Sequence, residues 1–592
     1  MSEPFAAVSQ DLDGQRPVTV SAWAAVGQAL QFEGERKQVL QAARYRLIAL
    51  LSIFMAGFFV LGLRAVEVAI LSPHAPSAST YAAAEVPRRA DVLDRHGQLL
   101  ATTLTTYSLF VDPSQVWDPR ETREAILTVL PDLDVAKLDE ALGGKGRFQW
   151  VARNLTPKQK QAIFELGQPG LDFKLEERRI YPRNTLAAHA MGYAGVDNKG
   201  LSGAELAFDQ EILAGGESGQ PFQLSLDVRV QNALDDELRQ AMDKHQAKGA
   251  VGIISDITTG EILALTSLPD YDLNDPQSAE GAAQFNRAAR GVYEMGSTFK
   301  IFTVAMGLDE GVVTLEDSYD ATKPLKIGGR VIHDYHAENR QLTVEEIFTH
   351  SSNIGTAQLA LDAGPKTLQK FLKQLGLFDA ADVELVESAR PLLPKKWNDS
   401  TAASVSFGHA MSVSPLALTA AINALMNTGR YVPLTLKKRG AHEDVQGRQV
   451  VSAETSHAML QLMRANVVRG SGSKADVPGY RVGGKTGTAE KSGAGGYDRD
   501  RLLSSFAAVY PTDAPKYSVL VILDEPKGLP ETYGYATGGW TAAPVVGRVI
   551  ARTASFLGVE RRFDVPEPAK AQSLAQWRAQ NDAIAQAVTG GR

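Results

Sequence analysis

The chain has 592 residues, of which 44% are hydrophobic and 22% are charged, and its formal net charge is -7 at pH 7. A chain of this length is too long for one ordinary hydrophobic core, so we expect two or more folded domains. The slight acidity argues against a nucleic-acid partner, and the lack of cysteine excludes disulfides, thiolate metal sites and cysteine nucleophiles.

The first feature along the chain is an uncharged apolar run, LIALLSIFMAGFFVLGL, at residues 47–63. As a helix this run spans roughly 26 Å, close to a hydrocarbon core of about 30 Å. Arg46 and Arg64 can reach the two membrane interfaces. We therefore predict a membrane-spanning helix within residues 47–70; a buried core helix and a cleaved signal peptide are the alternatives.

The charges around this run predict its orientation. Arg36, Lys37, Arg44 and Arg46 precede it, whereas residues 68–84 contain no lysine or arginine. The excess of positive charge predicts a cytoplasmic tail at residues 1–46 and an extracytoplasmic position for everything after about residue 70. Residues 71–85 are small, polar and proline-bearing, which predicts a linker.

Two folded domains are expected beyond the linker. Residues 86–225 mix short extended and helical runs and predict a first, mixed domain. Residues 226–562 have strand-like runs at both ends, at 249–257, 261–268, 481–490, 502–511 and 517–526, with helical patterns between them that include 298–310, 343–362 and 415–427. This order predicts an α+β fold whose antiparallel sheet joins its first and last strands. Residues 563–592 predict a peripheral or disordered tail.

A serine and a lysine begin one of these helical patterns, in the stretch GVYEMGSTFKIFTV. Ser297 and Lys300 lie one turn apart on the same helix face, which brings the amine within reach of the hydroxyl. A serine nucleophile needs such a base, and the helix N-terminus offers N–H groups to an oxyanion. By itself the pattern favours an N-cap serine beside a solvated lysine. We interpret a second copy, Ser471 and Lys474 in GSGSK, as chance because no apolar helix follows it.

Two further motifs favour a catalytic serine over a capping serine at position 297. The first is Ser351 and Asn353 in THSSNIG, at the start of another helical pattern, and the second is KTGT, residues 485–488, on a predicted strand. A strand of small residues with an open edge can pair with an extended peptide, and a lysine beside two threonines can bind a terminal carboxylate. The order Ser-x-x-Lys, Ser-x-Asn, Lys-Thr-Gly is the signature of penicillin-binding proteins and serine β-lactamases.

Nearly the whole chain resembles the class B penicillin-binding proteins. RRADVLDRHGQLLA, at 88–101, is similar to the entry of the family's non-catalytic pedestal domain. RRIYPRNTLAAHAMGYAG and GLSGAELAFDQEILAG are similar to its second pedestal motif and match it at Arg178, Tyr181, Pro182, His189, Gly203 and Glu205. YEMGSTFK, SFGHAMSVSPLAL and TYGYATGGWTAAPVVGRV look most like the division-specific member, the septal transpeptidase.

The resemblance implies a serine D,D-transpeptidase that crosslinks peptidoglycan stem peptides ending in D-Ala-D-Ala and is acylated by β-lactams. Ser297 would be the nucleophile and Lys300 its base, with Ser351 relaying a proton and Asn353 holding the substrate amide and Lys300. The substrate-binding residues would be Lys485, Thr486, Gly487 and Thr488. The backbone N–H groups of Ser297 and Thr488 would form the oxyanion hole, and no cofactor or metal is expected.

The resemblance also implies partners and a location. The partners would be a membrane-embedded glycan polymerase of the shape, elongation, division and sporulation family and other division proteins. The protein would be a single-pass protein of the inner membrane at the division septum, with its catalytic domain in the periplasm. The alternatives are an elongation-specific transpeptidase, a β-lactamase or carboxypeptidase, and a non-catalytic β-lactam receptor.

Two other polar clusters are interpreted as structural. His333, His336 and Glu338 could suggest a metal site, but GGRVIHD predicts a hairpin, so we interpret them as surface residues. The stretch GSGSKADVPG lacks the ending of a phosphate loop, and its glycines predict a flexible loop.

Overall fold

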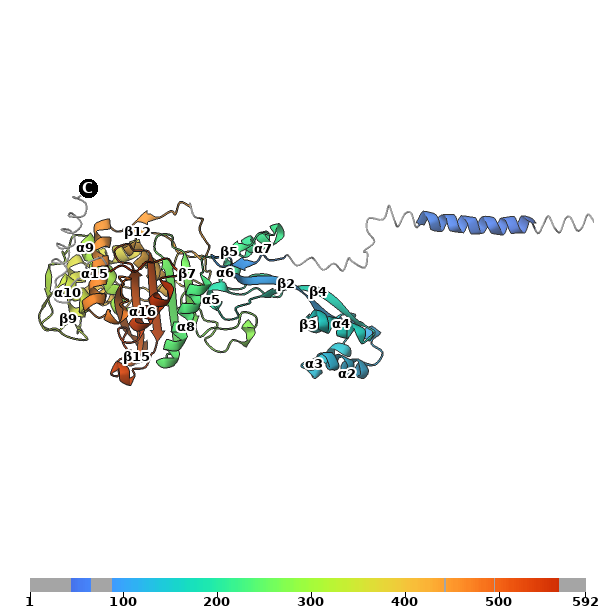
Figure 1. Ribbon diagram of the computed structural model, residues 1–592, viewed down its shortest axis with the longest axis horizontal. Helices are drawn as coiled ribbons and strands as arrows, with labels where there is room; N and C mark the ends of the chain where they lie inside the picture. The colour runs from blue at the N-terminus through green and yellow to red at the C-terminus, as the bar shows by residue number, and fades with distance from the viewer. Residues whose placement is uncertain (1–43, 65–87, 441–442, 494–495, 564–592) are drawn as a thin grey trace, which may run out of the picture. The chain divides into compact units, whose positions relative to one another are not determined.

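The computed structural model describes residues 44–64, 88–440, 443–493 and 496–563 (Figure 1). The chain divides into two units, Met1–Glu85 and Val86–Arg592. The described part of the first unit is a helix, Arg44–Arg64, whose 21 residues are long and apolar enough to cross a membrane. It begins three residues before the predicted apolar run, at the basic flank. The predicted linker and nearly all of both predicted tails lie outside the described residues.

The second unit begins with a five-stranded sheet in the order β3-β2-β1-β5, with β4 paired to β2. The long strand β2 forms antiparallel ladders with both β3 and β4, and its Leu109 and Val111 point into a small core against three helices. The strands are β1 (Val92–Leu93), β2 (Leu99–Val111), β3 (Gln149–Leu155), β4 (Leu171–Ile180) and β5 (Phe222–Gln223). The helices are α2 (Pro119–Val129), α3 (Val135–Leu142), α4 (Pro157–Glu165), α5 (Ala188–Met191), α6 (Gly203–Ala207) and α7 (Asp209–Ser218), with a 3-10 turn at Pro113–Gln115.

A buried ion network holds the base of this region together. Arg89 and Arg179 each donate a hydrogen bond of 2.7 Å to the Glu205 carboxylate, whose side chain is 0% exposed. The hydroxyl of Tyr181 also donates to Glu205. Arg179, the residue after the matched Arg178, is the buried position of β4 and the arginine of that strand that reaches Glu205.

The remainder of the second unit is built on an antiparallel sheet in the order β14-β15-β16-β6-β7. Its strands are β6 (Gly249–Asp256), β7 (Ile262–Leu268), β14 (Gly483–Gly493), β15 (Gly496–Tyr510) and β16 (Tyr517–Asp524). Strand β16 pairs with β6 along its whole length, so the sheet joins the first and last strands as the sequence predicts. The predicted hairpin of β6 and β7 and the predicted α+β class are both confirmed.

Helices cover both faces of this sheet. The alternating residues Ala250 and Ile254 pack under α8 (Val228–Lys244) and α16 (Ala542–Thr553), which lie beside each other. Val251 and Ile253 face the larger core, which contains helices α9 (Lys300–Asp309), α10 (Val344–Thr349), α11 (Asn353–Ala363), α12 (Pro365–Gln374), α13 (Asp399–Ser406), α14 (Pro415–Met426) and α15 (Ala453–Arg469). This core continues without a break into the base of the first region, through residues such as Tyr181 and Phe208.

Short elements connect these layers. Two small antiparallel ladders, β8 (Ser318–Asp320) with β11 (Gln341–Thr343) and β9 (Leu325–Ile327) with β10 (Arg330–Ile332), lie before α10. The predicted hairpin at GGRVIHD is therefore confirmed. A third pair joins β12 (Arg430–Tyr431) and β13 (Arg448–Gln449), and 3-10 turns occur at Pro276–Ser278, Gly296–Phe299, Ser473–Ala475 and Pro530–Thr532.

One predicted helix is interrupted. The helical pattern at 343–362 forms two helices, α10 and α11, separated at residues 350–352. Ser351 has a φ of 60° in the left-handed region, which a helix cannot continue through, and Ser352 begins the next helix by accepting the N–H of Gly355. The interruption lies inside a motif that the sequence marks as functional.

We predict that Glu205→Gln lowers the free energy of unfolding by about 3–5 kcal/mol, because it leaves two buried arginines without their shared carboxylate. The measurement is thermal unfolding of the full chain in detergent. Asp139→Asn, which breaks the partly exposed ion pair with Arg123, is the control and costs less than about 1 kcal/mol. Equal melting temperatures for the two variants would contradict the prediction.

Candidate active site

Ser297 lies in the 3-10 turn Gly296–Phe299, directly before α9. Lys300, the first residue of α9, follows Ser297 by three residues at the end of this turn. The turn packs against β14: Gly296 has a φ of 54°, and a Cβ there would lie 2.3 Å from the carbonyl oxygen of Thr488. Glycine at this position therefore lets the backbone of Ser297 approach the backbone of Thr488.

The amine of Lys300 is directed at the second motif. Its Nζ donates to the carbonyl oxygen of Ser351 at 2.5 Å, to Ser351 Oγ at 3.1 Å and to Asn353 Oδ1 at 2.8 Å. In the described part of the chain, no hydrogen bond joins Lys300 to the half-buried hydroxyl of Ser297. The direct contact expected from the spacing is thus replaced by contacts to Ser351 and Asn353.

The third motif meets the second at the same hydroxyl. Lys485, on β14, donates from Nζ to Ser351 Oγ at 2.9 Å. Ser351 Oγ therefore contacts two lysine amines, one from the start of α9 and one from β14. The segments around 297, 351 and 485 form one site, as the sequence predicts, and Ser351 is at its centre.

Burial gives both amines unusual electrostatics, since each lysine is 0% exposed. Burial lowers the pKa of Lys300 well below its usual value, the nearby charge of Lys485 lowers it further, and the carboxylate of Asp334 opposes both effects. Burial also lowers the pKa of Lys485 to about 7. A lysine with a lowered pKa can take up a proton near neutral pH, which an exposed lysine cannot do.

The strand that carries the third motif is positioned to pair with a ligand. β14 is the terminal strand of the sheet, paired with β15, where Gly487 lies opposite Ser505. The Thr488 hydroxyl accepts the N–H of Gly538 at 3.1 Å. Thr486 is 7% exposed, and its hydroxyl lies 2.8 Å from that of Ser471. All the predicted substrate-binding residues thus lie on the terminal strand of the sheet.

Asp334 holds the second motif and was not predicted from the sequence. Its Oδ1 accepts the N–H groups of Asn353 at 2.5 Å and Ile354 at 3.0 Å, and its Oδ2 accepts the hydroxyl of Ser352 at 2.7 Å. The carbonyl of His333 accepts the amide of Asn353 at 2.9 Å, which turns Asn353 Oδ1 toward Lys300. The sequence contains no signal for these contacts, because residues 333–334 and 351–354 meet only in the folded structure.

The turn that carries Ser297 is also held by residues 408–410 and by Tyr497. The N–H of Gly296 donates to the carbonyl of Gly408 at 3.1 Å. Glu294 accepts the N–H of Ala410 at 2.7 Å and the hydroxyl of Tyr497 at 3.1 Å. The residues 408–410 and the β14–β15 hairpin thereby fix the chain directly before Ser297.

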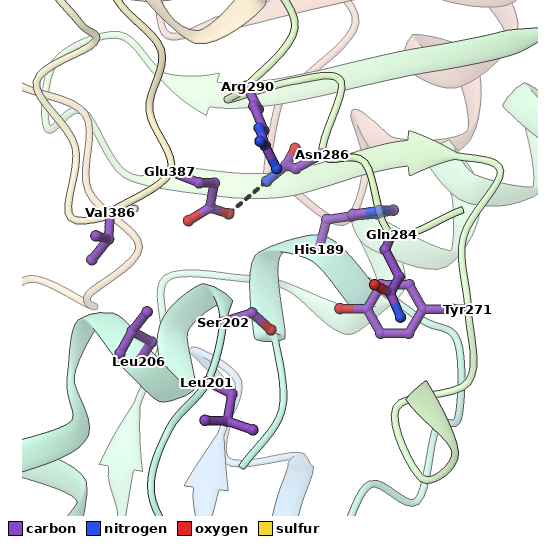
Figure 2. A pocket seen from close by; sticks show the side chains of 10 residues that line it. All are labelled: His189, Leu201, Ser202, Leu206, Tyr271, Gln284, Asn286, Arg290, Val386 and Glu387. Carbon is purple, nitrogen blue, oxygen red and sulfur yellow. Dashed lines mark hydrogen bonds between the residues drawn. The ribbon is translucent and has the colours of Figure 1, made fainter. Parts of the chain in front are cut away.

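Two other places lie outside the site formed by Ser297, Ser351 and Lys485. Over the residues that the structure describes, no group of three or more histidine, aspartate and glutamate side chains could hold a metal ion. Glu338 instead lies in ion-pair range of Arg340 and His350. Figure 2 shows a cavity between the α5–α6 region and the segments at 271–290 and 386–387, where Asn286 donates to Glu387 at 3.0 Å.

The fold and the site together define a serine acyl-transfer protein of the β-lactam-binding type. Residues 84–218 match the family model for the penicillin-binding protein dimerisation domain, and residues 250–551 match the penicillin-binding protein transpeptidase domain. The chain therefore belongs to the class B penicillin-binding proteins, a family whose ligands are peptidoglycan and β-lactams.

Relatives of known sequence extend along most of the chain. It is 50% identical over 533 residues to the probable peptidoglycan D,D-transpeptidase FtsI of Caulobacter vibrioides, which covers 88% of this chain and 90% of the relative. It is 29% identical over 509 residues to the peptidoglycan D,D-transpeptidase FtsI of Escherichia coli, covering 80% of this chain and 84% of the relative.

A solved structure has the same fold. Penicillin-binding protein 3 of Mycobacterium tuberculosis, crystallised with ampicillin, superposes with a TM-score of 0.64 at 23% identity. The match covers 83% of this chain and 99% of that structure. The fold expected from the sequence is therefore confirmed.

We predict that Asp334→Asn destabilises the protein by about 1.5–3 kcal/mol, because the carboxylate accepts three hydrogen bonds at the start of α11. It should also slow acylation by a β-lactam, since Ser351 and Asn353 lose their support. Asp317→Asn is the matched control, because Asp317 accepts an N–H and a hydroxyl from Thr314 outside the site. A variant as stable and as fast as the control would show that Asp334 does not support the motif.

Proposed function

We propose that the protein is a serine D,D-transpeptidase that crosslinks peptidoglycan stem peptides during septal cell-wall synthesis and is inhibited by β-lactams. The observation that carries this proposal is the Ser351 hydroxyl held between the buried amines of Lys300 and Lys485, with Ser297 in the turn that leads directly into Lys300. The 50% identity to a probable peptidoglycan D,D-transpeptidase of the division type supports the septal role.

In the proposed reaction, Ser297 Oγ attacks the carbonyl carbon of the penultimate D-alanine. Lys300, as a neutral amine, takes the hydroxyl proton. The backbone N–H groups of Ser297 and Thr488 stabilise the oxyanion, a role supported by the close approach of Gly296 to Thr488. The peptide bond then breaks, and the leaving D-alanine amine receives a proton from Lys300 through Ser351.

The second half of the reaction regenerates the enzyme. An amine of a neighbouring stem peptide attacks the ester on Ser297 and forms the new amide, and the proton it loses returns through Lys300 to Ser297 Oγ. Because the acyl-enzyme is an ordinary ester, water competes with the amine, so the ratio of crosslinked to hydrolysed product distinguishes a transpeptidase from a carboxypeptidase.

The proposed substrate contacts follow from the chemistry of β14. The donor peptide lies along the free edge of this terminal strand, and Lys485, Thr486 and Thr488 bind its terminal carboxylate. Gly487 has no side chain, and a Cβ there would lie 2.2 Å from Ser505 Oγ. Asn353 forms a hydrogen bond with the substrate amide and also accepts the hydrogen bond from Lys300.

The proposed location and partners rest on the apolar helix and the family. The helix Arg44–Arg64 anchors the chain in the inner membrane with its N-terminus in the cytoplasm, which the flanking charges favour. The catalytic region then lies in the periplasm at the septum. The proposed partners are a membrane-embedded glycan polymerase of the shape, elongation, division and sporulation family and other division proteins.

We predict that Ser297→Ala abolishes covalent labelling by a fluorescent penicillin and lowers crosslinking of lipid-linked glycan by roughly 10³-fold or more. The alanine has no oxygen with which to form the acyl-enzyme. The measurements are gel fluorescence and mass spectrometry of crosslinked dimers, with Ser278→Ala, in an exposed turn, as the control. Labelling of the Ser297 variant at the parent level would refute the assignment, and hydrolysis without crosslinking would identify a carboxypeptidase.

The acylation rate should rise with pH, because Lys300 accepts the proton only as a neutral amine. Burial and the charge of Lys485 lower the pKa of Lys300, so the midpoint of this rise lies well below 10.5. Lys485→Gln removes that charge and moves the midpoint to higher pH. The rates are measured by stopped flow with a β-lactam, and Lys474→Gln, an exposed lysine, is the control. A midpoint that stays in place in Lys485→Gln would contradict the coupling of the two amines.

A further inference from the structure

A cavity of about 240 Å³ lies between the α5–α6 region and the segments at 271–290 and 386–387 (Figure 2). Its lining includes the buried side chains of His189, Tyr271 and Asn286, which are 4–6% exposed, and Val386, which is 70% exposed, so it opens to the surface. Benzene fits in roughly 150 Å³, and sites for drug-sized ligands have roughly 300–1,000 Å³. A molecule about the size of an amino acid therefore fits this cavity.

Asn286 brings two charged residues of the lining together. Its Oδ1 accepts the N–H groups of Ala288 at 3.1 Å and Ala289 at 3.2 Å, and its carbonyl oxygen accepts the N–H of Arg290 at 2.8 Å. These bonds form a turn that ends at Arg290. The Nδ2 of Asn286 donates to Glu387 Oε1 at 3.0 Å. One buried amide thus places Arg290 and the carboxylate of Glu387 on the same side of the cavity (Figure 2).

Both charged groups have capacity left for a ligand. In the part of the chain that the structure describes, Glu387 Oε2 has no hydrogen-bond partner and Arg290 forms no ion pair. The guanidinium of Arg290 lies 5.8 Å from the ring centroid of Phe285, a contact that leaves its N–H groups free to donate. A carboxylate and a guanidinium with unused acceptor and donor positions form their strongest hydrogen bonds with groups of opposite charge.

The other groups that line the cavity are neutral or apolar. Burial lowers the pKa of His189 to about 4 and raises the pKa of Tyr271 to about 12, so both side chains are uncharged at neutral pH. Leu201, Leu206 and Val386 add apolar surface. The cavity therefore presents one negative group, one positive group and an apolar wall.

This combination selects among small ligands by charge. A simple anion would bring its charge near Glu387, a simple cation would bring its charge near Arg290, and like charges at close range are unfavourable. An amino acid carries an ammonium and a carboxylate on one carbon atom, so it matches both groups at once. A small apolar side chain on the same carbon can contact the leucine and valine side chains.

We propose that this cavity binds a small zwitterionic amino acid, with Glu387 accepting from its ammonium group and Arg290 donating to its carboxylate. The ligand would contact the α5–α6 region and the segment at 271–290 together, outside the site formed by Ser297, Ser351 and Lys485. D-Alanine, which the proposed reaction releases, is the probe of this class. Only the choice of probe rests on the proposed function.

The test measures binding of D-alanine to the full-length protein in detergent by ligand-observed NMR, before and after benzylpenicillin has occupied Ser297. We expect a Kd of about 1 mM in both states, because a ligand of so few atoms gains limited binding energy. Propionate lacks the ammonium group and the amide of D-alanine lacks the carboxylate. Each should bind about tenfold more weakly or worse, the loss of one charge-assisted hydrogen bond.

Two variants assign the charges. Glu387→Gln keeps an acceptor for Asn286 and should weaken D-alanine binding about tenfold without weakening propionate binding. Arg290→Gln should weaken D-alanine binding to a similar extent without weakening binding of the amide. Glu280→Gln and Arg390→Gln, exposed residues close in sequence to the two positions, are the matched controls and should change neither affinity.

The outcomes separate this site from the proposed function. No detectable binding of D-alanine, equal binding of the three compounds to the parent, loss of binding after acylation, or parent affinity in both variants would overturn the inference. A parent protein that benzylpenicillin does not acylate would instead overturn the proposed function. The comparison of the Glu387 and Arg290 variants, which does not involve Ser297, would then still decide the cavity.

Discussion

The site depends on one constraint: the buried amines of Lys300 and Lys485 both donate to the hydroxyl of Ser351. A buried charge is costly unless polar groups surround it, and two like charges this close cannot both be retained easily. The carbonyl and hydroxyl of Ser351 and the amide of Asn353 supply the polar contacts of Lys300. Burial also lowers the pKa of both amines below the usual value for lysine.

The three parts of the site lie at the ends or edges of helices and strands. Ser297 lies in a 3-10 turn before α9, Ser351 lies in the break between α10 and α11, and the Lys-Thr-Gly motif lies on the terminal strand β14. Ser351 has a left-handed backbone that costs of order 1–3 kcal/mol and persists only when its neighbours enforce it. Asp334 does so by holding the first N–H groups of α11.

The sequence predicted the parts of this arrangement that depend on periodicity and on motifs. The β6–β7 hairpin, the strands β14 to β16 and the junction of the first and last strands all follow from alternation and turn residues. The convergence of Ser297, Ser351 and Lys485 followed from the family motifs.

The break at Ser351 and the contacts of Asp334, Glu294 and Ser471 could not be predicted, because they join segments that meet only in the folded chain and show no local pattern. The ion pair of Arg179 with Glu205 could not be predicted either, since the motif match does not say which residues of the pedestal contact one another.

The pairing of β16 with β6 has a consequence for how the protein is made. Residues 249 and 524 are partners in the same ladder, so β6 has its neighbour on that side only after the chain has been synthesised as far as β16. Until then the hairpin of β6 and β7, buried on both faces in the native state, presents apolar surface and an unpaired edge to the surrounding solution. A chain cut between β7 and β16 keeps this hairpin but not its neighbour, so we expect such a fragment to aggregate and not to fold as a smaller domain.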